Sequence, residues 1–357
     1  MKLVLRANRA FTRRSRAQTG RMRILVLGGS SFLGRAYVTD ALRRGHQVTT
    51  FNRGLSGPDQ PGVEAIRGDR NSLSDLEDMV LNRHWEAVVD SSGGQPYAVA
   101  LATRLLRPHA DHYTFVSSIH AFIDWGKEPV DEDSTTYPSP ADTSPDQPPG
   151  NHLKAGCERA VLEYFGADRS LILYCGLLTG PHENVGRLSW WLERIARGGP
   201  VLAPGDPGRP VQLIDARDFA TFGLDLLQQR VTGRYITTGP PGAVTFGELL
   251  TSGVVATGNT AELVWIDEEK LFEAGVQPWT ELPAWAPDLP EWSAIWRADT
   301  SRAQAAGLRC RPIAETVGDT WAWIQERGPA DGPYRQGTTA LGINPEKERV
   351  LLGGATP

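Results

Sequence analysis

The sequence predicts an α/β fold in which helices cover both faces of a parallel β-sheet, followed by a smaller C-terminal region for substrate. Two observations predict it. Short apolar runs alternate with helical patterns through the first half of the chain, which is typical of βαβ units. In addition, the first apolar run, 23–27, breaks into glycines and then continues at helical spacing. A strand, a tight turn and a helix in this order open a doubly wound, Rossmann-type sheet.

The glycine-rich turn is the clearest functional motif in the chain. Gly28 allows a sharp turn, Ser31 is small enough to let a pyrophosphate approach the backbone, and Gly34 lets the helix pack against the strand. The helix N-terminus would offer free N–H groups to the phosphates. The alternative is a purely structural turn, or a relative that has lost its cofactor. We expect the turn to bind a dinucleotide through Gly28, Ser30, Ser31, Phe32, Leu33 and Gly34.

The end of the second predicted strand, 47–51, distinguishes between the nicotinamide cofactors. An acidic residue here would hold the ribose 2′-hydroxyl of NAD, whereas an arginine accommodates the 2′-phosphate of NADP. The sequence reads Asn52-Arg53 at this point and has no acid. The guanidinium of Arg53 can bind phosphate through two parallel hydrogen bonds. The sequence therefore favours NADP(H), unless Arg53 is an ordinary surface residue in an arginine-rich chain.

Further strands are predicted at 63–69, 86–90, 112–118 and 170–175, and helices at 72–81 and 97–106. Their alternation continues the parallel sheet, and ligands of such sheets lie at the carboxyl ends of the strands. Residues at or beside these ends are expected to contact the cofactor: Asp69, Arg70, Ser92, Ser117 and Tyr174.

Composition narrows the functional class. The chain has 357 residues, of which 40% are hydrophobic, which allows a large buried core. Its net charge of −5 argues against non-specific nucleic-acid binding. It has no run of 18 apolar residues that could span a membrane. The three cysteines, Cys157, Cys175 and Cys310, form neither a disulfide framework nor a metal motif. We expect a cytoplasmic protein without a bound metal.

Four regions are expected along the chain. Residues 1–21 are basic and contain no acid; we expect a disordered tail, and Met22 could be the true start, although such a leader could instead be a transit peptide. An NADP-binding Rossmann core is expected over 22–180. A substrate-binding region, some of whose strands and helices return to the core, is expected over 181–327. Residues 328–357 lack periodicity and predict a second disordered tail.

The chain resembles the extended short-chain dehydrogenase/reductases, in the branch of NAD-dependent epimerases and dehydratases common in actinobacteria. The glycine turn, the strand ends Gly68-Asp69 and 116–118, and Lys154 carry the resemblance. It runs from about residue 22 to residue 327. The family usually has a glycine where this chain has Ser31.

The resemblance implies a catalytic serine, tyrosine and lysine. In the family, the lysine lowers the pKa of the tyrosine phenol, which exchanges a proton with the substrate oxygen, while the serine holds that oxygen. The serine falls on Ser118 and the lysine on Lys154. The tyrosine, expected four residues before Lys154, is replaced by Gly150. The usual general acid is therefore missing.

Another side chain has to exchange that proton with the substrate oxygen, unless the substrate or water does so or no reaction occurs. His120 is the first candidate, because it lies two residues after Ser118 and an imidazole titrates near neutral pH. The other candidates are His152, Tyr137, Tyr174 and His182.

A chain of this branch without the tyrosine resembles the atypical ketoreductases of angucyclinone antibiotic pathways. This implies NADPH-dependent reduction of a ketone on an aromatic, polyketide-like molecule, in which a neighbouring hydroxyl stabilises the developing alkoxide. Trp190 and Trp191 are adjacent on a predicted helix, so both should not face the core, and one would line an aromatic pocket. His182 and Tyr174 are the other expected substrate contacts.

Two alternatives remain open at this stage. The first is epimerisation or reduction of a nucleotide sugar. The second is a non-catalytic regulator that senses NADP(H), or an RNA-binding relative, although the acidic net charge speaks against RNA.

Overall fold

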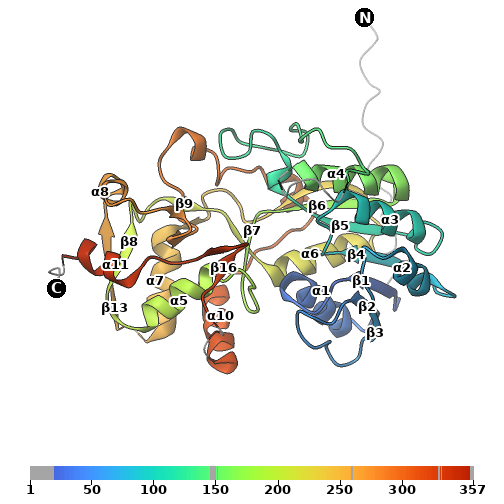
Figure 1. The fold of residues 1–357 in the computed structure, drawn as a ribbon, viewed down its shortest axis with the longest axis horizontal. Coiled ribbons are helices and arrows are strands. Elements are labelled where there is room, and N and C mark those ends of the chain that lie inside the picture. Colours follow the sequence, from blue (N-terminus) through green and yellow to red (C-terminus); the bar gives the residue numbers. More distant parts are fainter. Residues whose placement is uncertain are drawn as a thin grey trace, which may run out of the picture.

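The computed structural model describes residues 20–144, 150, 152–258, 260–328, 330 and 332–353. A seven-stranded sheet with the order β11-β6-β5-β4-β1-β2-β3 forms the larger half of the molecule (Figure 1). All its pairings are parallel. The predicted doubly wound Rossmann-type fold is confirmed. Its strands are β1 (Arg23–Leu27), β2 (Gln47–Asn52), β3 (Glu64–Arg67), β4 (Ala87–Asp90), β5 (Tyr113–Ser118), β6 (Ser170–Cys175) and β11 (Gly233–Thr237).

Helices cover both faces of this sheet, and the strands divide their side chains between two hydrophobic cores. Leu25 and Leu27 of β1 pack into one core, and Ile24 and Val26 pack into the other. Successive strand residues point to opposite faces, so a strand that is buried on both faces is apolar throughout. One face carries α1 (Phe32–Arg43) and α6 (Ala216–Gln228); the other carries α2 (Leu73–Val80), α3 (Pro96–Leu106) and α4 (His152–Ala160).

The remaining residues form a smaller region with its own core, on the left of Figure 1. Helices α5, α7 and α10 pack together beside a parallel pair, β8 and β13. The elements of this region are α5 (Arg187–Ala196), α7 (Phe246–Thr257), α8 (Glu268–Glu273), α10 (Ile313–Arg327), β8 (Gly199–Pro204) and β13 (Ala261–Ile266). Short strand pairs complete it: β7 (Leu177–Thr179) with β10 (Leu213–Asp215), β9 (Pro210–Val211) with β12 (Val244–Thr245), and β14 (Pro278–Trp279) with β15 (Leu282–Pro283). Helix α9 (Ser301–Ala305) instead packs beside β11 of the large sheet.

The C-terminal segment corrects the expectation of a disordered tail over 328–357. Residues 332–353 fold onto the smaller region as β16 (Arg335–Gln336), β17 (Thr339–Ala340) and α11 (Pro345–Leu351). Glu348 forms a 2.8 Å ion pair with Arg194 of α5 and accepts a hydrogen bond from the backbone N–H of Leu202. These partners are distant in sequence, so no local periodicity revealed the packing. The predicted N-terminal tail, 1–21, lies outside the described residues except for its last two.

No helix within the described ranges combines the length and the apolar character that crossing a bilayer requires.

Candidate functional site

The glycine turn has the geometry that a dinucleotide-binding turn requires. Gly28 and Gly29 have φ values of 105° and 98°, which glycine adopts without steric cost. The Gly28 N–H donates to the Phe51 carbonyl at 2.9 Å, so the turn is anchored to the end of β2. A Cβ at Gly34 would lie 2.7 Å from the Gly29 nitrogen. Only glycine therefore lets α1 approach the turn this closely, which is the packing role expected of Gly34.

The N-terminus of α1 is suited to an anion. Ser31 is the N-cap residue, and its hydroxyl makes no capping hydrogen bond; the first turn of α1 contains no acidic residue. The first N–H groups of a helix lack intrahelical partners and carry partial positive charge. A phosphate group can satisfy them.

A cleft of about 640 Å³ extends from this turn across the carboxyl ends of the strands. Its walls include residues that the sequence did not indicate, among them Leu55, Cys175, Leu178 and Asn184. Asn184 follows β7 in an irregular loop, where no pattern in the sequence marks it. The cleft brings together every expected cofactor contact except Tyr174: Gly28, Ser30, Ser31, Phe32, Leu33, Gly34, Asn52, Arg53, Asp69, Arg70, Ser92, Ser117 and Lys154, and with them Ser118.

Lys154 and Ser118 lie on the same side of this cleft. The Lys154 ammonium donates to the carbonyl oxygens of Gly93 and Val116 at 2.7 and 3.0 Å, which holds it at the carboxyl ends of β4 and β5. Ser118 ends β5, and its hydroxyl accepts a 3.3 Å hydrogen bond from the His120 N–H. The serine and lysine that the resemblance implies are thus close to the glycine turn, and Gly150 stands where the tyrosine is expected.

Arg70 lines the cleft but is committed to an ion pair within the protein. Its guanidinium donates to both oxygens of the fully buried Asp90, at 2.8 and 2.9 Å, and Tyr113 donates to the same carboxylate. Burial acts to raise the pKa of Asp90, but Arg70 and Tyr113 together lower it below its ordinary value. Arg70 therefore supports the cleft wall through Asp90.

Tyr174 does not reach the cleft, which corrects its expected contacts with cofactor and substrate. It is fully buried, and its hydroxyl donates to Glu158 at 2.8 Å. Ser117 lines the cleft, but it donates its hydroxyl to the other oxygen of Glu158, so this hydroxyl is used within the protein. Strand alternation explains the error, because the next residue, Cys175, faces the cleft in place of Tyr174.

Trp191 is buried, whereas Trp190 is only partly buried. Trp191 is 1% exposed and donates its indole N–H to the Pro283 carbonyl at 2.7 Å, so its expected substrate contact is wrong. Trp190 packs against Gly342, where an added Cβ would collide with its indole nitrogen. Trp190 lines a separate cavity of about 620 Å³ together with Trp321 of α10 and Tyr334 of the C-terminal segment, outside the cofactor cleft.

His182 also lies outside the cofactor cleft. Its ring packs 5.1 Å from that of Trp323, and it lines a separate cavity with Arg35 behind Phe32. Burial and the charge of Arg35 lower the pKa of His182 to about 4. The imidazole is therefore neutral near pH 7, and it lines a different cavity from Ser118.

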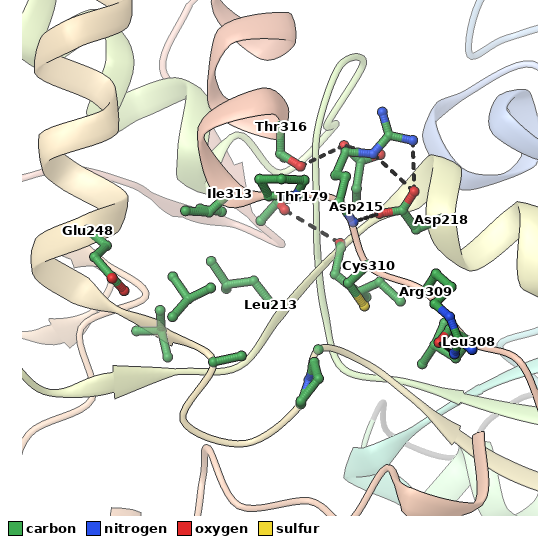
Figure 2. A pocket seen from close by; sticks show the side chains of 18 of the residues that line it. Thr179, Leu213, Asp215, Asp218, Glu248, Leu308, Arg309, Cys310, Ile313 and Thr316 are labelled. Carbon is green, nitrogen blue, oxygen red and sulfur yellow. Dashed lines mark hydrogen bonds and ion pairs between the residues drawn. The ribbon is translucent and has the colours of Figure 1, made fainter. Parts of the chain in front are cut away.

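A further cavity of about 560 Å³ lies on the opposite face of β7 (Figure 2). Leu178 lines the cofactor cleft, whereas the next residue, Thr179, lines this cavity. Successive side chains of a strand point to opposite faces, so β7 separates the two spaces. Asp215 and Thr316, joined by a 2.9 Å hydrogen bond, line the cavity at the junction of α6 and α10.

His120 packs against Trp125, with ring centroids 4.1 Å apart, and is not among the residues that line the cleft. We expect His120→Ala to change kcat by no more than about threefold, because an effective general acid contributes about 100-fold or more. Steady-state kinetics with NADPH would measure this. A drop of two decades with unchanged cofactor affinity would instead identify His120 as the proton donor.

Glu158 predicts a pH dependence of stability. Burial raises its pKa from 4.5 to about 7, so the folded protein binds more protons than the unfolded chain between these values. Its contribution is greatest below pH 4.5 and is lost as the pH rises through 7. Relative to Glu158→Gln, we expect the wild type to lose about 2–3 kcal/mol of unfolding free energy between pH 5 and 8.

Urea unfolding of both proteins at the two pH values would measure this difference. Parallel changes in the wild type and Glu158→Gln would contradict the raised pKa.

Comparison with known proteins identifies the family. The family model of NAD dependent epimerases/dehydratases matches residues 24–237. The chain belongs to this family. Membership supports a nicotinamide dinucleotide as the cofactor, and the residues of the cleft fit one: a turn that tolerates no Cβ at Gly34, an uncapped helix N-terminus at Ser31 and the ammonium of Lys154.

Two curated proteins are similar to parts of this chain. A chloroplast stem-loop binding protein of 41 kDa from Arabidopsis thaliana is 24% identical over 232 residues, 60% of this chain and 57% of the relative. A 3-beta-hydroxysteroid dehydrogenase from Mycolicibacterium neoaurum is 38% identical over 77 residues, 20% of this chain and 21% of the relative. The matched segments thus span little more than half of the first relative and about a fifth of the second.

Solved structures share the fold at low sequence identity. The Bordetella bronchiseptica enzyme WbmH, in complex with NAD⁺, has a TM-score of 0.65 at 14% identity; the match covers 87% of this chain and all of WbmH. The UDP-glucose 4-epimerase of Thermus thermophilus, in complex with NAD, has a TM-score of 0.61 at 18% identity and covers 85% of this chain and 99% of the epimerase. At these identities the likeness establishes the fold.

Proposed function

We propose that the protein is an NADPH-dependent ketoreductase that reduces a ketone on a flat, aromatic, polyketide-like molecule without a catalytic tyrosine. One observation carries the proposal. Ser118 and Lys154 line the same cleft as the glycine turn, while Gly150 occupies the position of the tyrosine. The cleft keeps what hydride transfer requires and lacks the usual group for exchanging a proton.

Four groups in the cleft would bind the cofactor and the substrate. Ser31 and the N-terminus of α1 hold the pyrophosphate, and Lys154 holds the nicotinamide ribose and adds positive charge nearby. Ser118 donates a hydrogen bond to the substrate oxygen, and this bond strengthens as negative charge develops there. Arg53 is exposed at the rim of the cleft and binds the 2′-phosphate. The bound cofactor supplies the hydride.

The missing tyrosine favours carbonyl reduction over epimerisation. Oxidising an alcohol requires a base to take its proton at the outset, whereas reducing a ketone requires a proton only as the alkoxide forms. A hydroxyl next to the ketone on an aromatic ring already donates a hydrogen bond to that oxygen. The local match to an enzyme named for a hydroxysteroid, another fused-ring molecule, agrees with this substrate class.

Two other functions each have an observation in their favour. The solved structures of similar fold include UDP-sugar epimerases, which favours a nucleotide-sugar substrate. The chloroplast relative from Arabidopsis thaliana is named for binding a stem-loop, which favours a non-catalytic, NADP(H)-binding regulator. Both remain alternatives that the same experiment separates.

The test is NADPH oxidation, followed by absorbance, with hydroxylated anthraquinone- and angucyclinone-like ketones beside a set of nucleotide sugars. We expect turnover on the aromatic ketones, and a loss of about tenfold or more in Ser118→Ala, which lacks the donor to the developing oxyanion. Turnover on the sugars alone would overturn the proposal in favour of the epimerase. Tight NADPH binding without turnover of any compound would favour the regulator.

A further inference from the structure

The carboxyl ends of β2 and β3 hold a polar cluster that sequence reading missed. Asn52 ends β2, Arg67 ends β3, and Asp59 lies in the loop between these strands. The Arg67 guanidinium donates to the side-chain oxygens of both Asn52 and Asp59. The cluster adjoins the rim of the cofactor cleft, which Asn52 and Arg53 line.

Asp59 is an acid close to the end of β2, where the sequence itself has none. Its carboxylate oxygens, however, already accept hydrogen bonds within the protein. Thr50 and Asn52 donate to Oδ1 at 3.3 and 3.2 Å, and Arg67 donates to Oδ2. The hydrogen bond from Arg67 is the main cause that lowers the pKa of Asp59, so the carboxylate is ionised and neutralised within the protein. A carboxylate in this state is a poor acceptor for the two hydroxyls of an NAD ribose, because it would have to give up Arg67.

Asn52 is also committed to the protein. Its amide donates to the Gly28 carbonyl and to Asp59, both at 3.2 Å, and its oxygen accepts from the Gly54 N–H and from Arg67. An asparagine side chain offers two donors and one acceptor oxygen with two lone pairs, so these contacts use its capacity. Asn52 therefore serves as an anchor between the glycine turn and this cluster.

Arg67 retains free capacity. A guanidinium carries five N–H donors, and the contacts to Asn52 and Asp59 use two of them. The side chain is half exposed and lies across Gly54, where an added Cβ would be 2.9 Å from Nε. Gly54 has a φ of 73°, so glycine here serves both the backbone and the position of Arg67. Arg53, the residue before Gly54, is exposed and makes no hydrogen bond or ion pair with any described residue.

We infer that Arg67, oriented by Asp59, joins Arg53 to form a two-arginine site for the 2′-phosphate of NADP(H), and that Asp59 thereby sets the preference for NADP(H) over NAD(H). This inference rests on the proposed NADPH-dependent function and deepens it. A phosphomonoester carries close to two negative charges and three acceptor oxygens at pH 7, so it suits the charge of Arg53 together with the N–H donors that Arg67 retains. Asp59 acts as a positioning residue that holds one of them.

The test measures dissociation constants for NADPH and NADH by nicotinamide fluorescence, without any ketone. For Arg67→Ala and Arg67→Gln, we expect NADPH to bind about tenfold or more weakly and NADH to change by no more than about twofold. NADH binding then reports that the variants are folded. Arg83→Ala is the matched control, because Arg83 pairs with Glu64 at the opposite end of β3 and should leave both affinities unchanged.

Competition with 2′,5′-ADP separates the phosphate site from the rest of the cleft. We expect this fragment to displace NADPH from the wild type and to lose affinity in Arg67→Ala, whereas 5′-AMP should bind both proteins equally. In Asp59→Asn we expect NADH affinity to stay within about twofold of the wild type, since no ribose contact is lost.

Three results would overturn parts of this account. A loss of NADH affinity of about tenfold in Asp59→Asn would identify Asp59 as a ribose acceptor and overturn the inference. An equal loss of NADPH and NADH in Arg67→Ala would do the same. If the protein binds NADPH more tightly than NADH and this preference is lost in Arg67→Ala, but no ketone is reduced, the proposed function is overturned and the phosphate site stands.

Discussion

Lys154→Met should lower kcat/KM for the proposed NADPH-dependent ketone reduction by about 100-fold or more. The Lys154 ammonium lies at the carboxyl ends of β4 and β5, held by the carbonyls of Gly93 and Val116. Methionine keeps the length of the side chain but removes the charge and the N–H donors. The substrate oxygen would then become negative without a nearby cation, and the ribose would lose its anchor. Steady-state kinetics and the NADPH dissociation constant would separate the two contributions.

Lys127→Met provides the matched control, since Lys127 is exposed and is not among the residues that line the cleft. We expect it to behave as the wild type. Turnover within a few-fold of the wild type in Lys154→Met would mean that the lysine has lost its family role in this chain.

Asp215→Ala should lower the free energy of unfolding by about 3–4 kcal/mol, because it removes one partner of a buried ionic network. The Asp215 carboxylate, labelled in Figure 2, is fully buried. It accepts hydrogen bonds from Arg217 and from Thr316 of α10, at distances of 2.7 to 2.9 Å, and lies 3.5 Å from Arg311. Burial acts to raise the pKa of Asp215, but Arg217 lowers it below its ordinary value, so it is ionised at neutral pH.

The network joins the start of α6 in the Rossmann half to α10 in the smaller region, so its loss should loosen the junction between them. Asp319→Ala is the matched control. Asp319 also pairs with Arg217, but its side chain is 45% exposed, and we expect a loss of about 1 kcal/mol or less. Urea unfolding would measure both; equal effects of the two variants would contradict the role given to burial.

The sequence predicted the sheet and the glycine turn because their requirements are local. Most strands of the sheet, such as β1 and β6, are short apolar runs between turns. Gly34 meets a steric demand set by Gly29, five residues earlier, whereas a Cβ at Gly28 would meet Ser91 and Ser92, far away in the sequence. Most of the residues that line the cleft were predictable for another reason, since parallel strands bring their carboxyl ends to one edge. Lys154 and Ser118 followed from a resemblance, and the structure brought both to that edge.

The errors concern the direction in which a side chain points, or contacts between residues that are far apart in the sequence. Tyr174 and Cys175 are adjacent at the end of β6, and their side chains point to opposite faces of the sheet, so only Cys175 lines the cleft. The cavity beside Trp190 could not be placed, because the segment that forms part of its wall, about 150 residues later, has no periodicity of its own. Asp59 was overlooked because it lies in a loop, and only folding brings it to Asn52 and Arg67.

The sequence by itself determined the doubly wound sheet, the dinucleotide turn and the membership of a family that uses such a turn, because spacing and steric demand act over a few residues. Only the tertiary structure decided which side chains face the cleft, which charges are already paired within the protein, and which surfaces the C-terminal segment covers. Those depend on contacts between residues far apart in the chain, and a local pattern carries no information about a partner that distant.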